Sequence, residues 1–145
     1  SSDLPVPPLD VDVRGYERAT VDEEIARGHE VLGWAVRFGV ALWERDGFWS
    51  TLAERWRGRL PLPSAEAAEE RAARAHRFSG ELRAAGDEDA AREEWTTALT
   101  QRARARLIRA GVFPASRPEL PEQLIAIGER GLAAELFDLL ERRAS

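Results

Sequence analysis

The sequence predicts a mainly α-helical fold, a helical bundle of about five to six helices with one short N-terminal strand. Apolar residues recur every three or four positions over most of the chain after residue 20, as on the buried faces of helices. Ser, Thr or Asp precedes several of these segments and Gly follows them, which favours helix starts and ends there. With 145 residues, 43% of them hydrophobic, the chain can bury a core. We expect an extended segment over residues 1–20 and a helical domain over residues 21–145.

The single strand is predicted near the N-terminus. Prolines between Leu4 and Pro8 exclude a helix, and the segment Leu9 to Val13 alternates apolar and acidic residues. One strand cannot pair its own backbone groups, so it should pair with another copy or with protein outside this chain. Asp10 and Asp12 would project from one face of it, as two carboxylates do when they hold a divalent cation. A solvated strand face explains the pair equally well.

A central helix is predicted from Val21 to Phe38. Thr20 and Glu23 fit a capping box at its start, and apolar residues then cover most of its circumference. Gly28 and Gly33 lie inside this helix, where glycine costs about 1 kcal/mol relative to alanine. Their presence indicates close approach of another backbone or of a ligand, and close helix packing is the more common explanation.

Gly39 is predicted to end the central helix in the left-handed conformation. The pair Asp46-Gly47 predicts a turn, and a short helix from Phe48 to Trp56 should follow it. Pro61 and Pro63 then separate the two halves of the chain.

An αα-hairpin is predicted in the second half. Ser64 caps a helix that runs to Ala85, Gly86 breaks it, and Asp87 caps a second helix that runs to Ala110. In this second helix, residues repeating at every fourth position separate an inward stripe from an outward one. The inward stripe is Ala91, Trp95, Leu99, Ala103 and Leu107, and the outward stripe is Arg92, Thr96, Thr100 and Arg104.

The chain should end in a short helix pair. Ser116 and Glu119 form a second capping box, which leads into a helix from Leu120 to Ile127. Glycines 128 and 131 then separate it from a last helix over Leu132 to Arg143.

Composition excludes several classes of function and suggests a compartment. Cysteine is absent, so disulfide scaffolds, thiolate metal sites and cysteine nucleophiles are excluded. Because no apolar run approaches the roughly 20 residues that cross a bilayer, we expect a cytoplasmic protein without membrane association. All the basic residues are arginine, a bias typical of GC-rich bacterial genomes. The net charge of −5 argues against general nucleic-acid affinity, although a local basic patch is compatible with it.

The sequence lacks the common motifs of hydrolases, kinases and dehydrogenases. It has no G-x-S-x-G, no phosphate-binding G-x-x-x-x-G-K and no G-x-G-x-x-G. His29-Glu30 begins like a zinc-protease helix, but Gly33 stands where the second histidine is needed. His76 has no second ligand at metal-binding spacing and is expected to face solvent. The chain more plausibly binds or positions a ligand than carries out chemistry with its own residues.

Arginines and tryptophans are the remaining candidates for ligand binding. The cluster Arg102, Arg104, Arg106 and Arg109 could grip a phosphate, but basic residues late in a helix also interact favourably with its dipole, and this structural role is favoured. Tryptophan can stack on a nucleobase. Trp34 and Trp95 fall on apolar stripes and are expected in the core, whereas Trp43 and Trp49 in the loop region are the better candidates for exposed platforms.

Much of the chain resembles the C-terminal helical part of a small bacterial nucleotidyltransferase, in the superfamily of DNA polymerase β and kanamycin nucleotidyltransferase. The resemblance lies in the order and spacing of short segments, not in one diagnostic motif. These segments are Asp10–Val13, Tyr16, Glu24–Gly28, Leu32–Ala35, Phe38–Val40, Arg109–Pro114 and Arg117–Leu120.

The resemblance implies a function and a set of site residues. In that superfamily a small sheet carries three metal-binding carboxylates, and a C-terminal helical bundle covers the nucleotide or the acceptor. Asp10 or Asp12 would match the third carboxylate and would bind Mg²⁺, and Arg117, Trp43 and Trp49 would contact substrate. The Gly-Ser and Asp-x-Asp motif that carries the other carboxylates is missing, and the prolines after Ser1-Ser2 exclude that pair as a substitute. This chain alone is therefore expected to be inactive, because two-metal chemistry needs both carboxylate sets.

Two alternatives belong to other classes. The hairpin from Ala72 to Leu107 resembles one unit of a tetratricopeptide-type repeat, which would make the chain a protein-interaction module. The strand could instead pair with its copy across a two-fold axis in a homo-oligomeric regulatory bundle. The expected partners are accordingly an upstream catalytic domain, a nucleotide, a protein partner or a second copy of the chain.

Overall fold

The computed structural model describes residues 13–144, which form seven α-helices and one 3-10 helix. A mainly helical class is therefore confirmed, with seven α-helices in place of about five to six. The predicted strand is not found among the described residues: Val13 is not in a strand, and Leu9 to Asp12, with Asp10, lie outside them. In chain order the helices are α1 (Arg18–Ala26), α2 (Glu30–Phe38), α3 (Phe48–Trp56), α4 (Ala65–Ala84), α5 (Glu88–Arg109), the 3-10 helix η1 (Arg117–Glu119), α6 (Leu120–Ala126) and α7 (Arg130–Ala144).

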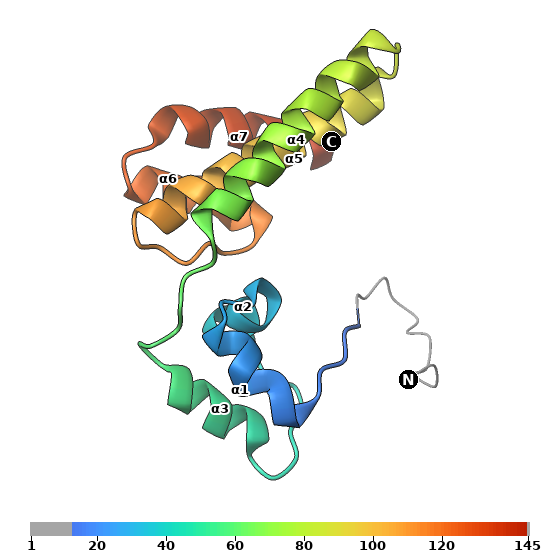
Figure 1. The fold of residues 1–145 in the computed structure, drawn as a ribbon. Coiled ribbons are helices and arrows are strands. Elements are labelled where there is room, and N and C mark those ends of the chain that lie inside the picture. The colour runs from blue at the N-terminus through green and yellow to red at the C-terminus, as the bar shows by residue number, and fades with distance from the viewer. Residues whose placement is uncertain (1–12, 145) are drawn as a thin grey trace.

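The helices gather into two groups, each with its own apolar core (Figure 1). Helices α1–α3 form a small trio, and the long hairpin α4–α5 with α6 and α7 forms a larger group. Residues 57–64 connect the two groups. The trio buries Val21, Ile25, Leu32 and Leu52. The larger group buries Leu99, Ala103, Leu107, Leu120, Leu124, Ala133 and Leu136.

The single central helix predicted from Val21 to Phe38 is wrong, because Gly28 breaks it. Gly28 has φ +83°, the left-handed conformation that ends a helix. Its N–H donates to the Ile25 carbonyl at 2.9 Å, and the His29 N–H donates to the Glu24 carbonyl at 3.1 Å, the pair of bonds of a Schellman end. The His29 side chain then starts α2 by accepting from the Leu32 N–H at 3.2 Å.

Both predicted ends of that helix also differ from the structure. Helix α1 begins at Arg18 after Glu17, and the Thr20 hydroxyl donates to the Glu17 carbonyl at 3.3 Å instead of forming a capping box. Gly39 ends α2 with φ −70° and ψ 154°, which is extended backbone and not the left-handed conformation. The chain therefore leaves α2 directly into the loop that precedes α3, and α3 has the predicted bounds.

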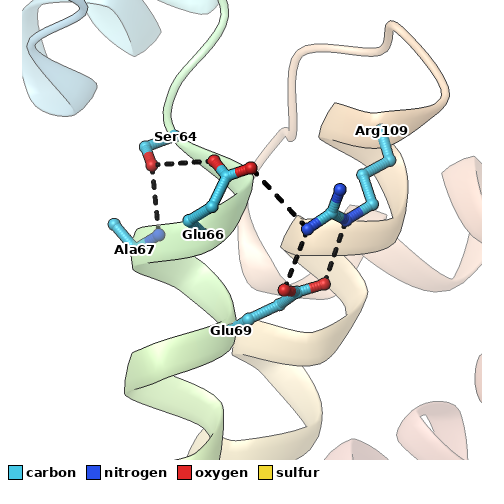
Figure 2. Close-up of polar contacts among 5 residues, drawn as sticks. All are labelled: Ser64, Glu66, Ala67, Glu69 and Arg109. Atoms are coloured by element: carbon cyan, nitrogen blue, oxygen red, sulfur yellow. Dashed lines mark hydrogen bonds and ion pairs between the residues drawn. The ribbon is translucent and has the colours of Figure 1, made fainter.

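The predicted hairpin is confirmed as α4 and α5. The Ser64 hydroxyl accepts from the Ala67 N–H at 3.1 Å, and the Asp87 carboxylate accepts from the Ala90 N–H at 3.1 Å. At the open end of the hairpin, Arg109 of α5 forms paired bonds of 3.0 and 2.9 Å to the Glu69 carboxylate of α4, and Glu66 lies beside them (Figure 2). Buried alanines of α4, such as Ala68 and Ala72, have small side chains that let the two helices approach closely.

Two threonines of α5 contradict the predicted outward stripe. Thr96 and Thr100 are both 3% exposed, because α5 has α4 on one side and α6 and α7 on others. Their hydroxyls donate to carbonyls one turn earlier, from Thr96 to Arg92 at 2.9 Å and from Thr100 to Thr96 at 2.7 Å. This internal bonding satisfies the hydroxyls, so burial leaves no unpaired donor. Arg92 is exposed as predicted, and Arg104 is half-buried.

The C-terminal helix pair follows the predicted capping box. Ser116 and Glu119 form it at η1, α6 follows, and Gly128 with φ +87° turns the chain into α7. Helix α7 starts at Arg130 and so includes Gly131, slightly earlier than predicted. No helix in residues 13–144 combines the length and apolarity needed to cross a bilayer.

Asp22 ties α1 to α3, and its replacement should weaken the trio in a pH-dependent way. Its carboxylate accepts from Arg55 and from the Trp56 indole N–H, the latter at 2.8 Å. The hydrogen bond from Arg55 holds the pKa of Asp22 below its ordinary value of 3.8. Because the pKa of Asp22 is lower in the folded state than in the unfolded state, the ionised carboxylate stabilises the fold at pH values above the ordinary pKa. This stabilisation is lost as the pH falls through the lowered pKa of the folded state.

We therefore expect Asp22→Asn to lower the free energy of unfolding by about 1 kcal/mol at pH 7, since the site is half-exposed. The difference should shrink at pH 3. Urea unfolding at both pH values measures this, with the exposed Asp138→Asn as the control. A deficit of equal size at both pH values would contradict the assignment.

Candidate functional site

The two groups of helices meet at a junction held by one ion pair and one aromatic contact. Arg71 of α4 donates to both Glu30 carboxylate oxygens of α2, at 2.9 and 3.1 Å. Phe113, in the loop after α5, places its ring 6.1 Å from that of Phe38. A Cβ on Gly33 would lie 3.1 Å from the Phe113 ring, so the close neighbour at Gly33 is a side chain and not the backbone or ligand that was predicted. These contacts fix α2 against the larger group.

A pocket of about 460 Å³ opens at this junction. Its size is within the range of small-molecule sites. Residues of α2, of α5 and of the start of η1 line it. The lining residues are Glu30, Val31, Trp34, Gln101, Arg104, Ser116 and Arg117.

The loop that carries Arg117 is rigidly held. The Gln123 side chain of α6 accepts from the Ala115 N–H at 2.9 Å and donates to the Phe113 carbonyl at 3.1 Å. The Glu119 carboxylate accepts from the Ser116 N–H at 3.2 Å within the capping box. Because both ends of the turn are fixed, Arg117 enters the pocket from a defined backbone position.

Arg104 and Arg117 make the pocket electropositive. Burial lowers the pKa of Arg104, and the charges of Arg117 and Arg71 lower it further against the attraction of Glu30. Burial, and then the charge of Arg143, also lowers the pKa of Arg117. Both guanidiniums stay charged, so the protein holds two partly desolvated cations near one another. Within residues 13–144 neither side chain forms a hydrogen bond or ion pair, and Glu30 is already bonded to Arg71.

Two further side chains complete the pocket. Trp34 is half-buried, with its ring 5.9 Å from that of Phe38, and it offers a supported aromatic surface. The Gln101 Oε1 atom is buried and accepts no hydrogen bond from the described residues. Because this oxygen has almost no accessible surface, it does not face a ligand in the pocket. The pocket can therefore offer an anion two cations and an aromatic face.

The predicted substrate-binding residues are placed differently from one another. Arg117 lines the junction pocket. Trp43 is 80% exposed in the loop between α2 and α3, beside Leu42, which is 97% exposed. Trp49 packs against the core of the trio. Neither Trp43 nor Trp49 lines the pocket, and their role in binding remains a prediction.

Three arginines of the predicted cluster, Arg102, Arg106 and Arg109, line one groove between α4 and α5. Arg109 bonds Glu69, and Arg106 lies 3.4 Å from the Glu129 carboxylate, so these two act within the fold. Only Arg104 of this cluster reaches the junction pocket.

Metal sites were predicted only for the N-terminal carboxylates. Asp10 and Asp12 lie outside the described residues, so the expected Mg²⁺ site is not placed. Among residues 13–144, no three Asp, Glu or His side chains gather closely enough to hold a metal ion. His76 is exposed as expected, with its ring 5.3 Å from that of Trp95.

Trp34 and Gln101 were not selected from the sequence as binding residues, and Arg104 was considered only within an arginine cluster for which a structural role was favoured. Trp34 was assigned to the core because it falls on an apolar stripe, and Arg104 to a solvent-facing stripe. The burial of Ala103 and Ala105 on either side of Arg104 is apparent only in the structure. The approach of α2 to α5 depends on a long-range contact that spacing does not reveal.

Comparisons with family models, curated protein sequences and solved structures found no match.

Proposed function

We propose that this chain is a helical nucleotide-binding module whose junction pocket holds a phosphate between Arg104 and Arg117 and a base against Trp34. The observation that carries the proposal is the pair of partly buried guanidiniums that form no ion pair with a described carboxylate, although Glu30 attracts Arg104 and Glu93 attracts Arg117 from a distance. A phosphate would supply the missing charge and accept bidentate hydrogen bonds.

The expected affinity is moderate. Each charge-assisted hydrogen bond contributes about 1.5–3 kcal/mol, and base stacking on an aromatic ring about 1–3 kcal/mol. Losing the freedom of the ligand offsets part of this sum. A dissociation constant between about 1 µM and 1 mM follows for a nucleoside monophosphate.

Calorimetric titration with AMP, adenosine and inorganic phosphate tests the proposal. AMP should bind at one site, about tenfold or more tighter than either fragment, because only AMP engages both the arginines and the tryptophan. Phosphate binding as tight as AMP binding would remove the role of Trp34. If no binding is detected at millimolar concentrations of AMP, the proposal is rejected.

We expect Arg104 to lower the free energy of unfolding, as residues that bind a ligand often do. Because its charge is partly desolvated and lies near two other arginines, Arg104→Met should raise the free energy of unfolding by about 1 kcal/mol. That corresponds to an increase of about 3 °C in Tm. AMP should no longer raise the Tm of this variant. Thermal unfolding with and without AMP measures both effects, and a lower Tm for the variant would show that Arg104 serves the fold.

We further propose that the module covers the substrate of a nucleotidyltransferase-like protein, as the sequence resemblance implies. The catalytic sheet would then lie upstream of Ser1, with Asp10 or Asp12 as its third carboxylate and Mg²⁺ as its cofactor. The gene upstream of Ser1 should encode a Gly-Ser at a helix start followed by an Asp-x-Asp strand. A gene without this segment would reject the catalytic context and leave the nucleotide pocket as a separate proposal.

A further inference from the structure

A second electropositive groove lies on the hairpin beside the junction pocket. It has a volume of about 560 Å³ and lies between α4 and α5. Helix α4 contributes Arg71, Arg74, Arg77 and Glu81, together with Phe78, whose side chain is 48% exposed. Helix α5 contributes Glu94, Thr97 and Gln101.

The groove and the junction pocket adjoin. Gln101 lines both of them. Arg71 of the groove bonds Glu30 of the pocket, so this ion pair lies at the boundary. A ligand longer than one nucleotide could pass along α5 from Arg117 and Arg104 to Arg74 and Arg77.

Charge on the joined surface is opposite to that of the whole chain. Five arginines and three glutamates line it, although the chain carries a net charge of −5. One of those glutamates, Glu30, is bonded to Arg71. Within the described residues, Arg74 and Arg77 form no hydrogen bond or ion pair. Four guanidiniums are thus available along one path, two in the pocket and two in the groove.

We propose that this joined surface binds a short single-stranded nucleic acid, with one terminal nucleotide in the junction pocket and the following phosphates on Arg74 and Arg77. The inference rests on the proposed nucleotide pocket and extends it. Proteins bind single strands by combining a basic groove with aromatic side chains on which bases stack. Trp34 and Phe78 supply such surfaces in the pocket and in the groove, respectively. The chain as a whole carries a net charge of −5, so a duplex that extends beyond this local path is disfavoured and single strands are preferred.

Fluorescence anisotropy of 5′-fluorescein oligoadenylates of four and eight nucleotides tests the inference on the full chain, with AMP titrated in parallel. The octanucleotide should bind about tenfold or more tighter than AMP, because it gains two charged contacts. Arg74→Gln with Arg77→Gln should remove this gain and leave AMP affinity unchanged. It should also reduce the slope of log affinity against log salt by about 1.4, or 0.7 for each lost phosphate contact.

Arg57→Gln with Arg59→Gln is the control matched in charge, because it removes two exposed positive charges outside both cavities, although Arg57 also pairs with Glu54 at 3.0 Å. Equal losses in the two double variants would show charge attraction without a site and overturn the inference. AMP binding without tighter binding of the octanucleotide would overturn it while the nucleotide pocket stands. Octanucleotide affinity that does not change when Arg104 is replaced would overturn both the inference and the nucleotide pocket. Absence of binding of AMP and of the octanucleotide would also overturn both. Thermal unfolding confirms that each variant is folded.

Discussion

Leu107→Ala is expected to destabilise the protein by about 3–5 kcal/mol and to lower its Tm by about 10 °C or more. Leu107 is completely buried where α5, α6 and α7 meet, and its backbone carbonyl also accepts from the Val112 N–H at 2.9 Å. Replacing leucine by alanine leaves a cavity at this position. Because residues of several packed helices surround the position, the neighbouring side chains cannot easily move to fill the cavity. Circular dichroism at 222 nm during heating measures the loss for the whole larger group.

Leu52→Ala is the matched comparison, since Leu52 is 1% exposed in the separate core of the trio. It should unfold α1–α3 first and leave α4–α7 folded, which gives two transitions in place of one. Because Trp34 lies in the trio and Arg104 does not, Leu52→Ala should also lose AMP binding before the larger group melts. A single transition shared by both variants would mean that the two cores fold as one unit.

Arg104→Gln combined with Arg117→Gln is expected to weaken AMP binding about 100-fold or more, since each removed charge costs about 1.5–3 kcal/mol of charge-assisted hydrogen bonding. Glutamine keeps part of the length and polarity of arginine, so the pocket should keep its shape. Titration calorimetry measures the change, and the Arg57→Gln and Arg59→Gln pair serves again as the control for net charge. A change smaller than about threefold would place the phosphate elsewhere.

Local signals in the sequence predicted most of the helices. Ser64, Asp87 and the pair Ser116 and Glu119 each cap a helix with their own side chains, and such capping needs only residues three positions apart. Gly86 ends α4 for an equally local reason, its φ of +88°. These features follow from neighbouring residues, so the sequence was sufficient to place them.

Errors arose where a residue has two possible local roles. Gly28 was placed inside a helix because apolar residues continue on both sides of it, but its left-handed backbone divides α1 from α2. Thr96 and Thr100 were assigned to solvent because they are polar, whereas bonds to their own helix allow them to be buried. Local hydrogen bonds close the helix end at Gly28, whereas tertiary packing buries the two threonines.

The candidate site was only partly predictable. Arg117 was selected through the resemblance, and it does line the pocket. Trp34 and Arg104 come together only because Arg71 binds Glu30 and Phe113 packs on α2. Those contacts join residues about 40 or more positions apart, and helical periodicity carries no information at that range.

The indole N–H signals of the five tryptophans during an AMP titration test the central claim most directly, with Trp34→Phe used to assign the Trp34 signal. A base bound in the junction pocket should shift the Trp34 signal and leave those of Trp43 and Trp49 in place. Movement of the Trp43 or Trp49 signal while that of Trp34 stays fixed would contradict the pocket and return the site to the loop between α2 and α3.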